Sequence, residues 1–266
     1  MNAFKQPAPA QQLQQTARIA LACLDLTSLN DTDSEADIAS LCQRAQTAFG
    51  PVAAVCVWPR LAAFARAQLP AHIGVAAVAN FPHGGADIDA AVHDTRQIVL
   101  AKAQEVDVVL PYKSLMAGDD AAVLALLSAV RQACPGLVLK VILETGELKT
   151  TALIERACQL SLQAGADFLK TSTGKTPISA TPDAAHTMLG AIAASAGARA
   201  HVGFKASGGI RTVQDATVYM ALVAQILGAD ALNPRQFRIG ASSILNDIEA
   251  VLGGNPGNAT HVAHGY

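Results

Sequence analysis

The sequence predicts a single (β/α)₈ barrel, and three observations lead to that prediction. The chain has 266 residues, a length at which an α/β barrel forms one domain. Hydrophobic residues make up 51% of the chain and aromatic residues only 4%, so most apolar side chains are the aliphatic ones of parallel strands and packed helices. Short apolar runs also alternate along the whole chain with stretches of helical periodicity.

The strands are predicted from continuous apolar runs. A strand that is covered on both faces reads as an uninterrupted apolar run, so runs of this kind are typical of a parallel barrel. The eight predicted strands cover residues 21–26, 52–58, 73–79, 105–110, 137–144, 167–171, 201–206 and 237–240.

The helices are predicted from apolar residues that recur every three or four positions between the strands. Two helix starts have capping signals. Thr181 precedes a proline and an acidic residue, which suits the first turn of a helix, and Thr212 precedes Asp215 with the spacing of a capping box. The predicted helices include 35–48, 84–103, 119–133, 147–164, 183–196, 213–227 and 242–252.

A doubly wound open sheet is the main competing architecture. Such a sheet usually has fewer strands and often has a glycine-rich turn after the first one. Here the first predicted strand is followed by Thr-Ser-Leu-Asn at 27–30, without glycine. We therefore expect one barrel domain over residues 1–266, with flexible tails at about 1–15 and 253–266.

The charge and the cysteines are typical of a cytoplasmic protein that binds no nucleic acid. With 19 basic and 21 acidic residues, the net charge is −2, so no basic excess exists to neutralise a phosphate backbone. The apolar runs stop at about ten residues, too short for a membrane span, and the first residues lack the apolar core of a signal peptide. The five cysteines are odd in number and have no Cys-x-x-Cys spacing, as expected of reduced thiols.

The positions of the lysines are the strongest anomaly in the sequence. Three of the eight lysines, Lys140, Lys170 and Lys205, lie inside predicted strands. Lysine is rarely buried and is depleted in strands. One such residue could extend to the surface or pair with an acid, but three in one barrel favour a cluster of lysines in its interior.

Alternation of side chains along the strands suggests what this cluster could do. If Lys170, Lys205 and Asp107 all point inward, they converge at the mouth of the barrel. Two cations in a poorly solvated pocket lower each other's pKa, and desolvation acts in the same direction, so one lysine would be partly neutral, as an amine nucleophile must be. Asp107 is then either a proton-transfer group or the partner in a structural ion pair. The residues alone leave that choice open, and they do not say which lysine is the nucleophile.

Glycine-rich turns before two predicted helices indicate an anion site. Gly208 and Gly209 follow the seventh strand, and Gly240 precedes Ser242 and Ser243 after the eighth. The loops after these two strands commonly bind phosphate in barrels, and the N–H groups at a helix N-terminus favour anions. Ordinary helix capping is the alternative for either loop alone. Thr173 and Lys175, after the sixth strand, could add a hydroxyl and a cation to the same site.

We expect no metal and no cofactor. Four residues near the third strand have side chains of the metal-binding types: His83, Asp87, Asp89 and His93. They match no established zinc or magnesium pattern, so we interpret them as a capped acidic helix. Cys56 is interpreted as a core thiol. Asp25 and Asn80 lie at strand ends, where each either lines the mouth of the barrel or satisfies loop backbone.

Seven blocks of the sequence resemble the deoxyribose-phosphate aldolase family. They run in order between about residues 18 and 252, and the two blocks that contain Lys170 and Lys205 are the most specific. The blocks are LDLTSL (24–29), NFPHG (80–84), EVDVVLPY (105–112), VLKVILETGEL (138–148), DFLKTSTGK (167–175), VGFKASGGIRT (202–212) and FRIGASS (237–243).

The resemblance implies a class I aldolase that needs no metal. It implies reversible cleavage of 2-deoxy-D-ribose 5-phosphate to D-glyceraldehyde 3-phosphate and acetaldehyde. Lys170 would form the Schiff base, Lys205 would be the assisting cation and Asp107 would transfer protons. The phosphate contacts of the family correspond to Gly208, Gly209, Arg211, Ser242 and Ser243, with Lys175 nearby.

The resemblance also suggests supporting residues and partners. Asp25 and Lys140 would tune the charge cluster, Cys56 would lie near it, and Tyr266 ends the chain where the family uses a C-terminal tyrosine. Relatives often have Pro-Ala where this chain has Ala-Ser at 206–207. We expect a small phosphosugar substrate and a homo-oligomer, a dimer as is frequent in the family. Three alternatives stay open: a lysine-dependent aldolase for another phosphosugar, a non-catalytic phosphosugar sensor, and a metal-dependent lyase.

Overall fold

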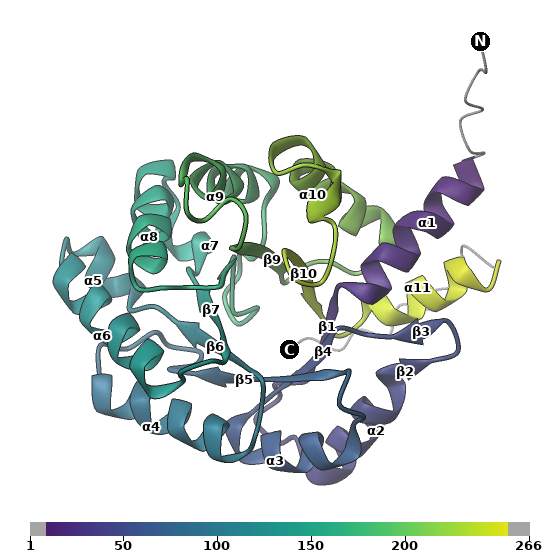
Figure 1. Ribbon diagram of the computed structural model, residues 1–266, viewed down its shortest axis with the longest axis horizontal. Coiled ribbons are helices and arrows are strands. Elements are labelled where there is room, and N and C mark those ends of the chain that lie inside the picture. The colour runs from purple at the N-terminus through teal and green to yellow at the C-terminus, as the bar shows by residue number, and fades with distance from the viewer. Residues whose placement is uncertain (1–8, 255–266) are drawn as a thin grey trace.

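Eight parallel strands close into a barrel in this computed structural model, which describes residues 9–254 (Figure 1). Around the barrel the strands follow the order β1-β10-β9-β8-β7-β6-β5-β4, and β4 pairs again with β1. All eight predicted strands are confirmed, and the closure rules out the open sheet. The strands are β1 Leu24–Thr27, β4 Ala54–Val57, β5 Gly74–Ala79, β6 Glu105–Val109, β7 Val138–Ile142, β8 Phe168–Lys170, β9 Gly203–Ser207 and β10 Phe237–Ala241.

Helices surround the barrel and connect successive strands (Figure 1). The predicted caps are confirmed: the Thr181 side chain accepts from the Ala184 N–H, and Thr212 and Asp215 form a capping box. The connecting helices are α2 Glu35–Arg44, α3 Pro59–Gln68, α4 Ile88–Leu100, α6 Asp120–Ala133, α8 Thr151–Gln163, α9 Pro182–Ala194 and α10 Val213–Ile226, and α11 Ile244–Leu252 follows the last strand. Short additional turns are α5 Tyr112–Met116, α7 Thr145–Leu148 and the 3₁₀ helix Ala229–Ala231.

The structure differs from the sequence prediction near the N-terminus. Helix α1, Pro9–Ala22, begins inside the segment expected to be flexible and includes the residues assigned to the start of the first strand. Leu13, Ala17 and Ala20 recur at helical spacing and pack into the core, and α1 lies beside α11 (Figure 1). A small hairpin of β2 Gln46–Thr47 and β3 Gly50–Pro51 also ends α2 earlier than predicted.

The apolar core lies mainly between the barrel and its helices. A second, smaller apolar cluster of Leu29, Cys56, Ala76 and Val78 lies apart from it, with Trp58 and Phe81 packed against it. Cys56 contacts Asp107, and Ala76 is the register partner of Cys56 on the neighbouring strand. This apolar cluster therefore lies on the inner face of the strands. One side of the interior is therefore apolar, and polar groups occupy the rest.

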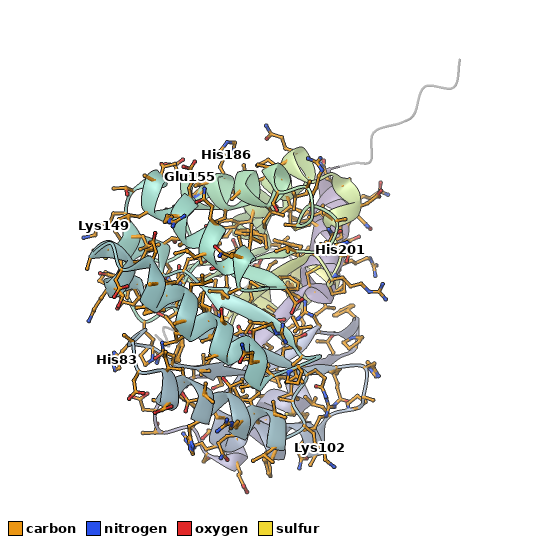
Figure 2. The ribbon with its side chains drawn as sticks, turned by 60° about the vertical axis from the view of Figure 1, so that its left-hand side comes forward. His83, Lys102, Lys149, Glu155, His186 and His201 are labelled. Carbon is orange, nitrogen blue, oxygen red and sulfur yellow. The ribbon has the colours of Figure 1, made fainter. Side chains whose placement is uncertain are left out.

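Several titratable side chains of the helices and loops lie on the outside of the molecule. His83, Lys102, Glu155 and His186 are exposed and lie at the periphery of the molecule (Figure 2). Between residues 9 and 254, none of the helices has the length and the apolarity needed to cross a membrane.

Candidate active site

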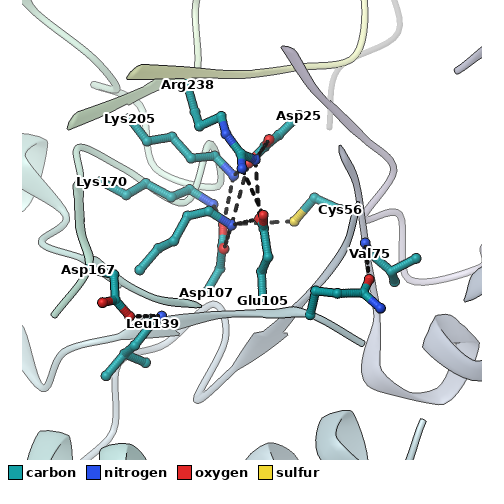
Figure 3. Close-up of polar contacts among 12 residues, drawn as sticks. Asp25, Cys56, Val75, Glu105, Asp107, Leu139, Asp167, Lys170, Lys205 and Arg238 are labelled. Atoms are coloured by element: carbon teal, nitrogen blue, oxygen red, sulfur yellow. Dashed lines mark hydrogen bonds and ion pairs between the residues drawn. The ribbon is translucent and has the colours of Figure 1, made fainter. Parts of the chain in front are cut away.

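Seven charged side chains form one buried cluster inside the barrel, and all of them except Lys140 are labelled in Figure 3. They come from six different strands, so the closed barrel, and not any local segment, brings them together. Each is less than a tenth exposed, and buried charges require partners of opposite sign. The cluster consists of Asp25, Glu105, Asp107, Lys140, Lys170, Lys205 and Arg238.

Strand register explains why three of the cations are neighbours. Lys170 pairs with Lys205 across β8 and β9, and Lys205 pairs with Arg238 across β9 and β10. Side chains at paired positions of adjacent parallel strands point to the same side of the sheet. Asp107 pairs with Lys140 across β6 and β7 in the same way. The structure thus brings together the three lysines and the acid that the sequence singled out.

Asp107 lies at the centre of the cluster. Its Oδ1 accepts a hydrogen bond from Lys140 Nζ at 2.7 Å. Its Oδ2 accepts from Lys170 Nζ at 2.9 Å and from Lys205 Nζ at 2.8 Å. Burial acts to raise the pKa of Asp107, but the three lysines outweigh it and hold this pKa well below its usual value. Asp107 is therefore an ionised carboxylate that contacts all three strand lysines.

Lys170 is the least compensated of these lysines. It contacts one carboxylate, Asp107, whereas Lys205 contacts two and Lys140 lies within 3.6 Å of three. Burial lowers the pKa of Lys170 and Lys205 lowers it further, while Asp107 opposes the shift. The neighbouring carboxylates instead raise the pKa values of Lys140 and Lys205. Lys170 is thus the amine that loses its proton most readily. Burial lowers its pKa more than the neighbouring Lys205 does.

Glu105 and Arg238 belong to the cluster but were not predicted from the sequence. Arg238 Nη1 donates to Asp25 Oδ1 at 2.6 Å, and its Nη2 donates to Glu105 Oε1 at 2.8 Å. The guanidinium carbon also lies 5.6 Å from the centroid of the Phe168 ring. Two signals were present in the sequence: Glu105 shares a strand face with Asp107, and Arg238 lies in the middle of an apolar run.

Two strand glycines leave the space that the cluster needs. A Cβ on Gly203 would lie 2.2 Å from Phe168 Cε1. A Cβ on Gly240 would lie 2.2 Å from Ser207 Oγ and 2.9 Å from Lys205 Cε. Because these neighbours are themselves enclosed, neither position accepts a side chain without a shift of its surroundings.

Gly240→Ala is expected to lower the free energy of unfolding by about 1–3 kcal/mol, because the added methyl overlaps Ser207 and the Lys205 stem. Denaturant titration measures the change. Gly190→Ala is the matched control: no heavy atom lies within 4 Å of the added Cβ, and alanine favours the interior of α9 by about 0.5–1 kcal/mol. Equal stability of Gly240→Ala and the unchanged protein would contradict the close packing.

The loops after β8, β9 and β10 meet at one end of the barrel. Gly208, with φ 84°, lies against the loop after β8: a Cβ there would be 2.5 Å from Ser179 Cβ and 3.5 Å from Gly174 Cα. The Gly208 N–H donates to the Gly240 carbonyl at 3.4 Å. Gly209, with φ 80°, has open space on its Cβ side. Gly208 therefore brings the turn after β9 against the loop after β8 and the end of β10.

The two helix starts at this end differ in their caps. The Thr212 side chain caps α10, as expected if the loop after β9 serves ordinary helix capping. Ser243 precedes α11 without a side-chain cap bond. Of the other predicted anion-binding side chains, Arg211 is exposed, and Ser242 and Lys175 are half-buried. Positive or N–H groups are thus accessible at the end of the barrel where the loops meet.

Thr173 is held by an acid that the sequence analysis did not select. Its Oγ1 donates to Glu144 Oε2 at 2.5 Å, and the Lys175 N–H donates to the same Oγ1 at 3.0 Å. Glu144 has φ 56°, which turns the chain at the end of β7 toward this loop. Burial raises the pKa of Glu144, while hydrogen bonds from Thr173 and Thr176 oppose the shift. Glu144 therefore anchors the loop that contains Lys175.

The remaining candidates have separate positions. Cys56 Sγ lies 3.9 Å from Asp107 Oδ2, and burial raises the pKa of its thiol. The Asn80 side chain donates to the carbonyls of Gly85 and Val109, so it satisfies loop backbone. Tyr266 lies outside the described residues.

The four side chains of metal-binding type near α4 do not converge. Asp87 is the N-cap of α4 and accepts from the Ala90 N–H, which confirms the capped helix. His83 and His93 are exposed. Within residues 9–254, no three His, Cys, Asp or Glu side chains are grouped as metal ligands would be.

Comparison with known proteins gives consistent matches over nearly the whole chain. A model of the DeoC/LacD family aldolases matches residues 19–249. Over 260 residues the chain is 47% identical to the deoxyribose-phosphate aldolase of Agrobacterium fabrum (strain C58 / ATCC 33970), covering 96% of this chain and 98% of that protein.

Two solved structures show the likeness of the fold. A crystal structure from Toxoplasma gondii ME49 has a TM-score of 0.84 at 23% identity, covering 93% of this chain and 96% of that one. The tetrameric deoxyribose phosphate aldolase from Aeropyrum pernix has a TM-score of 0.68 at 24% identity, covering 92% and 98%.

Proposed function

The chain belongs to the DeoC/LacD aldolase family, and we propose that it cleaves 2-deoxy-D-ribose 5-phosphate reversibly to D-glyceraldehyde 3-phosphate and acetaldehyde through an imine on Lys170. The name of the Agrobacterium fabrum relative supports this reaction. One observation carries the choice of Lys170: it is the buried amine with a single carboxylate partner and a lowered pKa.

The chemistry begins with attack of the neutral Lys170 amine on C1 of the open-chain sugar. Loss of water gives an iminium ion, which accepts the electron pair of the C2–C3 bond as that bond breaks. Asp107, directly or through a water, takes the proton of the C3 hydroxyl, and the C3 oxygen becomes the aldehyde of glyceraldehyde 3-phosphate. Protonation of the enamine at C2 and hydrolysis of the imine then release acetaldehyde and restore Lys170.

Lys205 supports both halves of this reaction. Its ammonium group donates to Asp107 and Asp25 and is held protonated by them, so it adds positive charge beside the Lys170 amine. Because Asp107 is a weak base in this surrounding, a proton that it receives passes on readily along its hydrogen bonds. We assign to Asp25 and Lys140, which contact the same groups, the role of tuning their charge.

The phosphate group is assigned to the loops after β8, β9 and β10. Support comes from the contact of Gly208 with the other two loops and from the uncapped start of α11. Thr173 is included as the residue through which Glu144 anchors the Lys175 loop. The proposed phosphate residues are Gly208, Gly209, Arg211, Gly240, Ser242, Ser243, Thr173 and Lys175. Cys56 completes the proposal as a neighbour of Asp107, and Tyr266, outside the described residues, is included as a supporting residue.

We also propose that the protein acts in the cytoplasm as a homo-oligomer, with a dimer as its state. The net charge and the cysteine pattern support the location, and the tetrameric relative from Aeropyrum pernix supports self-association. Light scattering on the purified protein measures the state, and a monomer at micromolar concentration would contradict the proposal.

Borohydride reduction in the presence of acetaldehyde is expected to attach an ethyl group to Lys170. At neutral pH the less compensated amine reacts, while Lys140 and Lys205 stay protonated. Peptide mapping by mass spectrometry identifies the labelled lysine. Incubation with 2-deoxyribose 5-phosphate in place of acetaldehyde must label the same lysine, because cleavage of the sugar leaves the acetaldehyde imine there, whereas the exposed Lys102 serves as the control for unspecific reaction. Preferential labelling of another lysine, or none, would overturn the assignment.

The same measurements separate the alternatives. An aldolase for another phosphosugar would cleave ribose 5-phosphate or a fructose phosphate faster than 2-deoxyribose 5-phosphate. A sensor would bind the phosphosugar but trap no imine, and a metal-dependent lyase would lose activity in EDTA.

A further inference from the structure

The buried cluster contains one more cation than carboxylates. Its cations are Lys140, Lys170, Lys205 and Arg238, and its carboxylates are Asp25, Glu105 and Asp107. A charge without a counter-charge is costly in a poorly solvated interior, so one of the four cations is disfavoured. Arginine keeps its proton in proteins, so the group that becomes neutral must be a lysine.

Geometry selects Lys170 as that lysine. It shares Asp107 with two other lysines and has no carboxylate of its own. Arg238 occupies one oxygen of Asp25 and also binds Glu105, so these two carboxylates are already engaged by cations other than Lys170. The neutrality of Lys170 is therefore a property of the whole cluster.

We propose that Arg238 is a positioning residue that keeps the Schiff-base lysine neutral from the opposite end of the cluster, by holding Asp25 and Glu105. This inference rests on the function proposed above for Lys170. The Arg238 side chain extends toward the strand starts, away from the substrate loops: its Nε donates to the carbonyl of Pro234, just before β10, and Glu105 is the first residue of β6.

Two continuous routes of contacts connect Arg238 with Lys170. On one route Arg238 binds Glu105 at 2.8 Å, Glu105 binds Lys140, and Lys140 binds Asp107 at 2.7 Å. On the other, Asp25 contacts Arg238 at 2.6 Å and Lys205 at 2.5 Å, and Lys205 contacts Asp107 at 2.8 Å. Both routes end at Asp107 Oδ2 or Oδ1, and Asp107 is 2.9 Å from Lys170.

Two further titratable groups act on Lys170 from the surrounding elements. Cys56 of β4 stays a thiol because burial raises its pKa. Glu144, at the end of β7, is bound by Thr173 and Thr176, and burial raises its pKa. Strand β5 contributes no titratable side chain within Gly74–Ala79. Neither Cys56 nor Glu144 contacts Arg238 or Glu105, so both act equally on all variants compared below.

Removal of Arg238 is expected to favour the protonated form of Lys170. In Arg238→Met three lysines face three carboxylates, so the cluster is balanced with every lysine protonated. The extra proton goes to Lys170 and not to a carboxylate, because an amine is more basic by about six pKa units. In Arg238→Met/Glu105→Gln three lysines face two carboxylates, and one lysine is again left without a counter-charge.

The test measures the pH dependence of borohydride trapping of acetaldehyde on Lys170 between about pH 5 and 10, scored by mass spectrometry. We expect Arg238→Met to raise the apparent pKa of trapping by about one unit or more, which means about tenfold slower trapping at a given pH below it. The double variant must return toward the unchanged protein. Glu105→Gln alone must not raise the apparent pKa.

Two results would overturn the role of Arg238: an apparent pKa that Arg238→Met leaves unchanged, or a double variant shifted as far as the single one. A merely structural arginine would lower the folded fraction without moving the pKa, so circular dichroism is recorded for each variant. If Arg238→Met does not fold, Arg238→Gln replaces it, because its amide still donates to either carboxylate. The double variant is also compared with Glu105→Gln, and this comparison measures the removal of Arg238 when Glu105 is already neutral. Proteins often tolerate the loss of both partners of a buried ion pair, as in the double variant.

The same data distinguish this inference from the proposed function. Failure to label Lys170 in the unchanged protein contradicts the imine mechanism itself. Labelling of Lys170 with the same apparent pKa in every variant leaves that mechanism intact and rejects only the contribution of Arg238.

Discussion

Replacement of Lys170 by methionine is expected to abolish aldol cleavage while the barrel stays folded. Methionine has a similar unbranched shape but no amine, so no imine forms, and kcat should fall by a factor on the order of 10⁴ or more. Stability should be retained because the neutral thioether leaves three cations against three carboxylates. An enzyme-coupled assay for glyceraldehyde 3-phosphate measures the activity, and denaturant titration measures the stability.

Lys170→Arg is the matched control for this experiment. It should be equally inactive, but less stable than Lys170→Met, because a permanent guanidinium adds a buried cation without a free carboxylate. Activity of Lys170→Met within tenfold of the unchanged protein would contradict the imine on Lys170. Equal stability of the two variants would contradict the imbalance of charge in the cluster.

Asp107→Asn is expected to separate imine formation from cleavage of the carbon–carbon bond. The carboxamide cannot take the proton of the C3 hydroxyl, so kcat for cleavage should fall by about 10²–10⁴. Trapping of acetaldehyde on Lys170 at neutral pH should persist, because Asp107 acts to raise the pKa of Lys170 and its loss leaves that amine neutral. The cleavage assay and the borohydride assay on one preparation measure both effects.

A neutralised acid outside the barrel provides the control for Asp107→Asn. Glu155→Gln, on the exposed face of α8, should leave both assays unchanged (Figure 2). Loss of trapping together with cleavage in Asp107→Asn would show that Asp107 mainly orients Lys170. Retention of both activities would exclude it as the proton-transfer group.

The sequence predicted the barrel and the centre of its site because both depend on patterns that repeat over a few neighbouring residues. Runs of apolar residues predicted the eight strands, and Lys170, Lys205 and Asp107 were expected to converge if their side chains point inward. Direct register pairing of Lys170 with Lys205 then made them neighbours. Glycine-rich turns located the three loops that meet near Gly208.

The remaining features depend on the closed barrel and could not be read from local patterns. Helix α1 has an apolar stripe whose partner, α11, lies at the other end of the sequence. Glu144 reaches the loop of Thr173 only because its positive φ turns the chain after β7. The pairing of Arg238 with Asp25 and Glu105 depends on side-chain length and on closure, although a search for buried arginines as well as lysines would have singled out Arg238.

The ion pairs of Asp25 have a consequence for the folding of this protein during its synthesis on the ribosome. Asp25 contacts Lys205 and Arg238, which follow it by 180 and 213 positions, so both partners are translated long after Asp25 itself. Until β9 and β10 have left the exit tunnel, the Asp25 carboxylate lacks these two cations and Lys140 is its partner at 3.6 Å, so hydration of the carboxylate opposes early collapse of the incomplete sheet. The Lys170 amine of a nascent chain therefore reaches its final surroundings only after β9 and β10 have been synthesised.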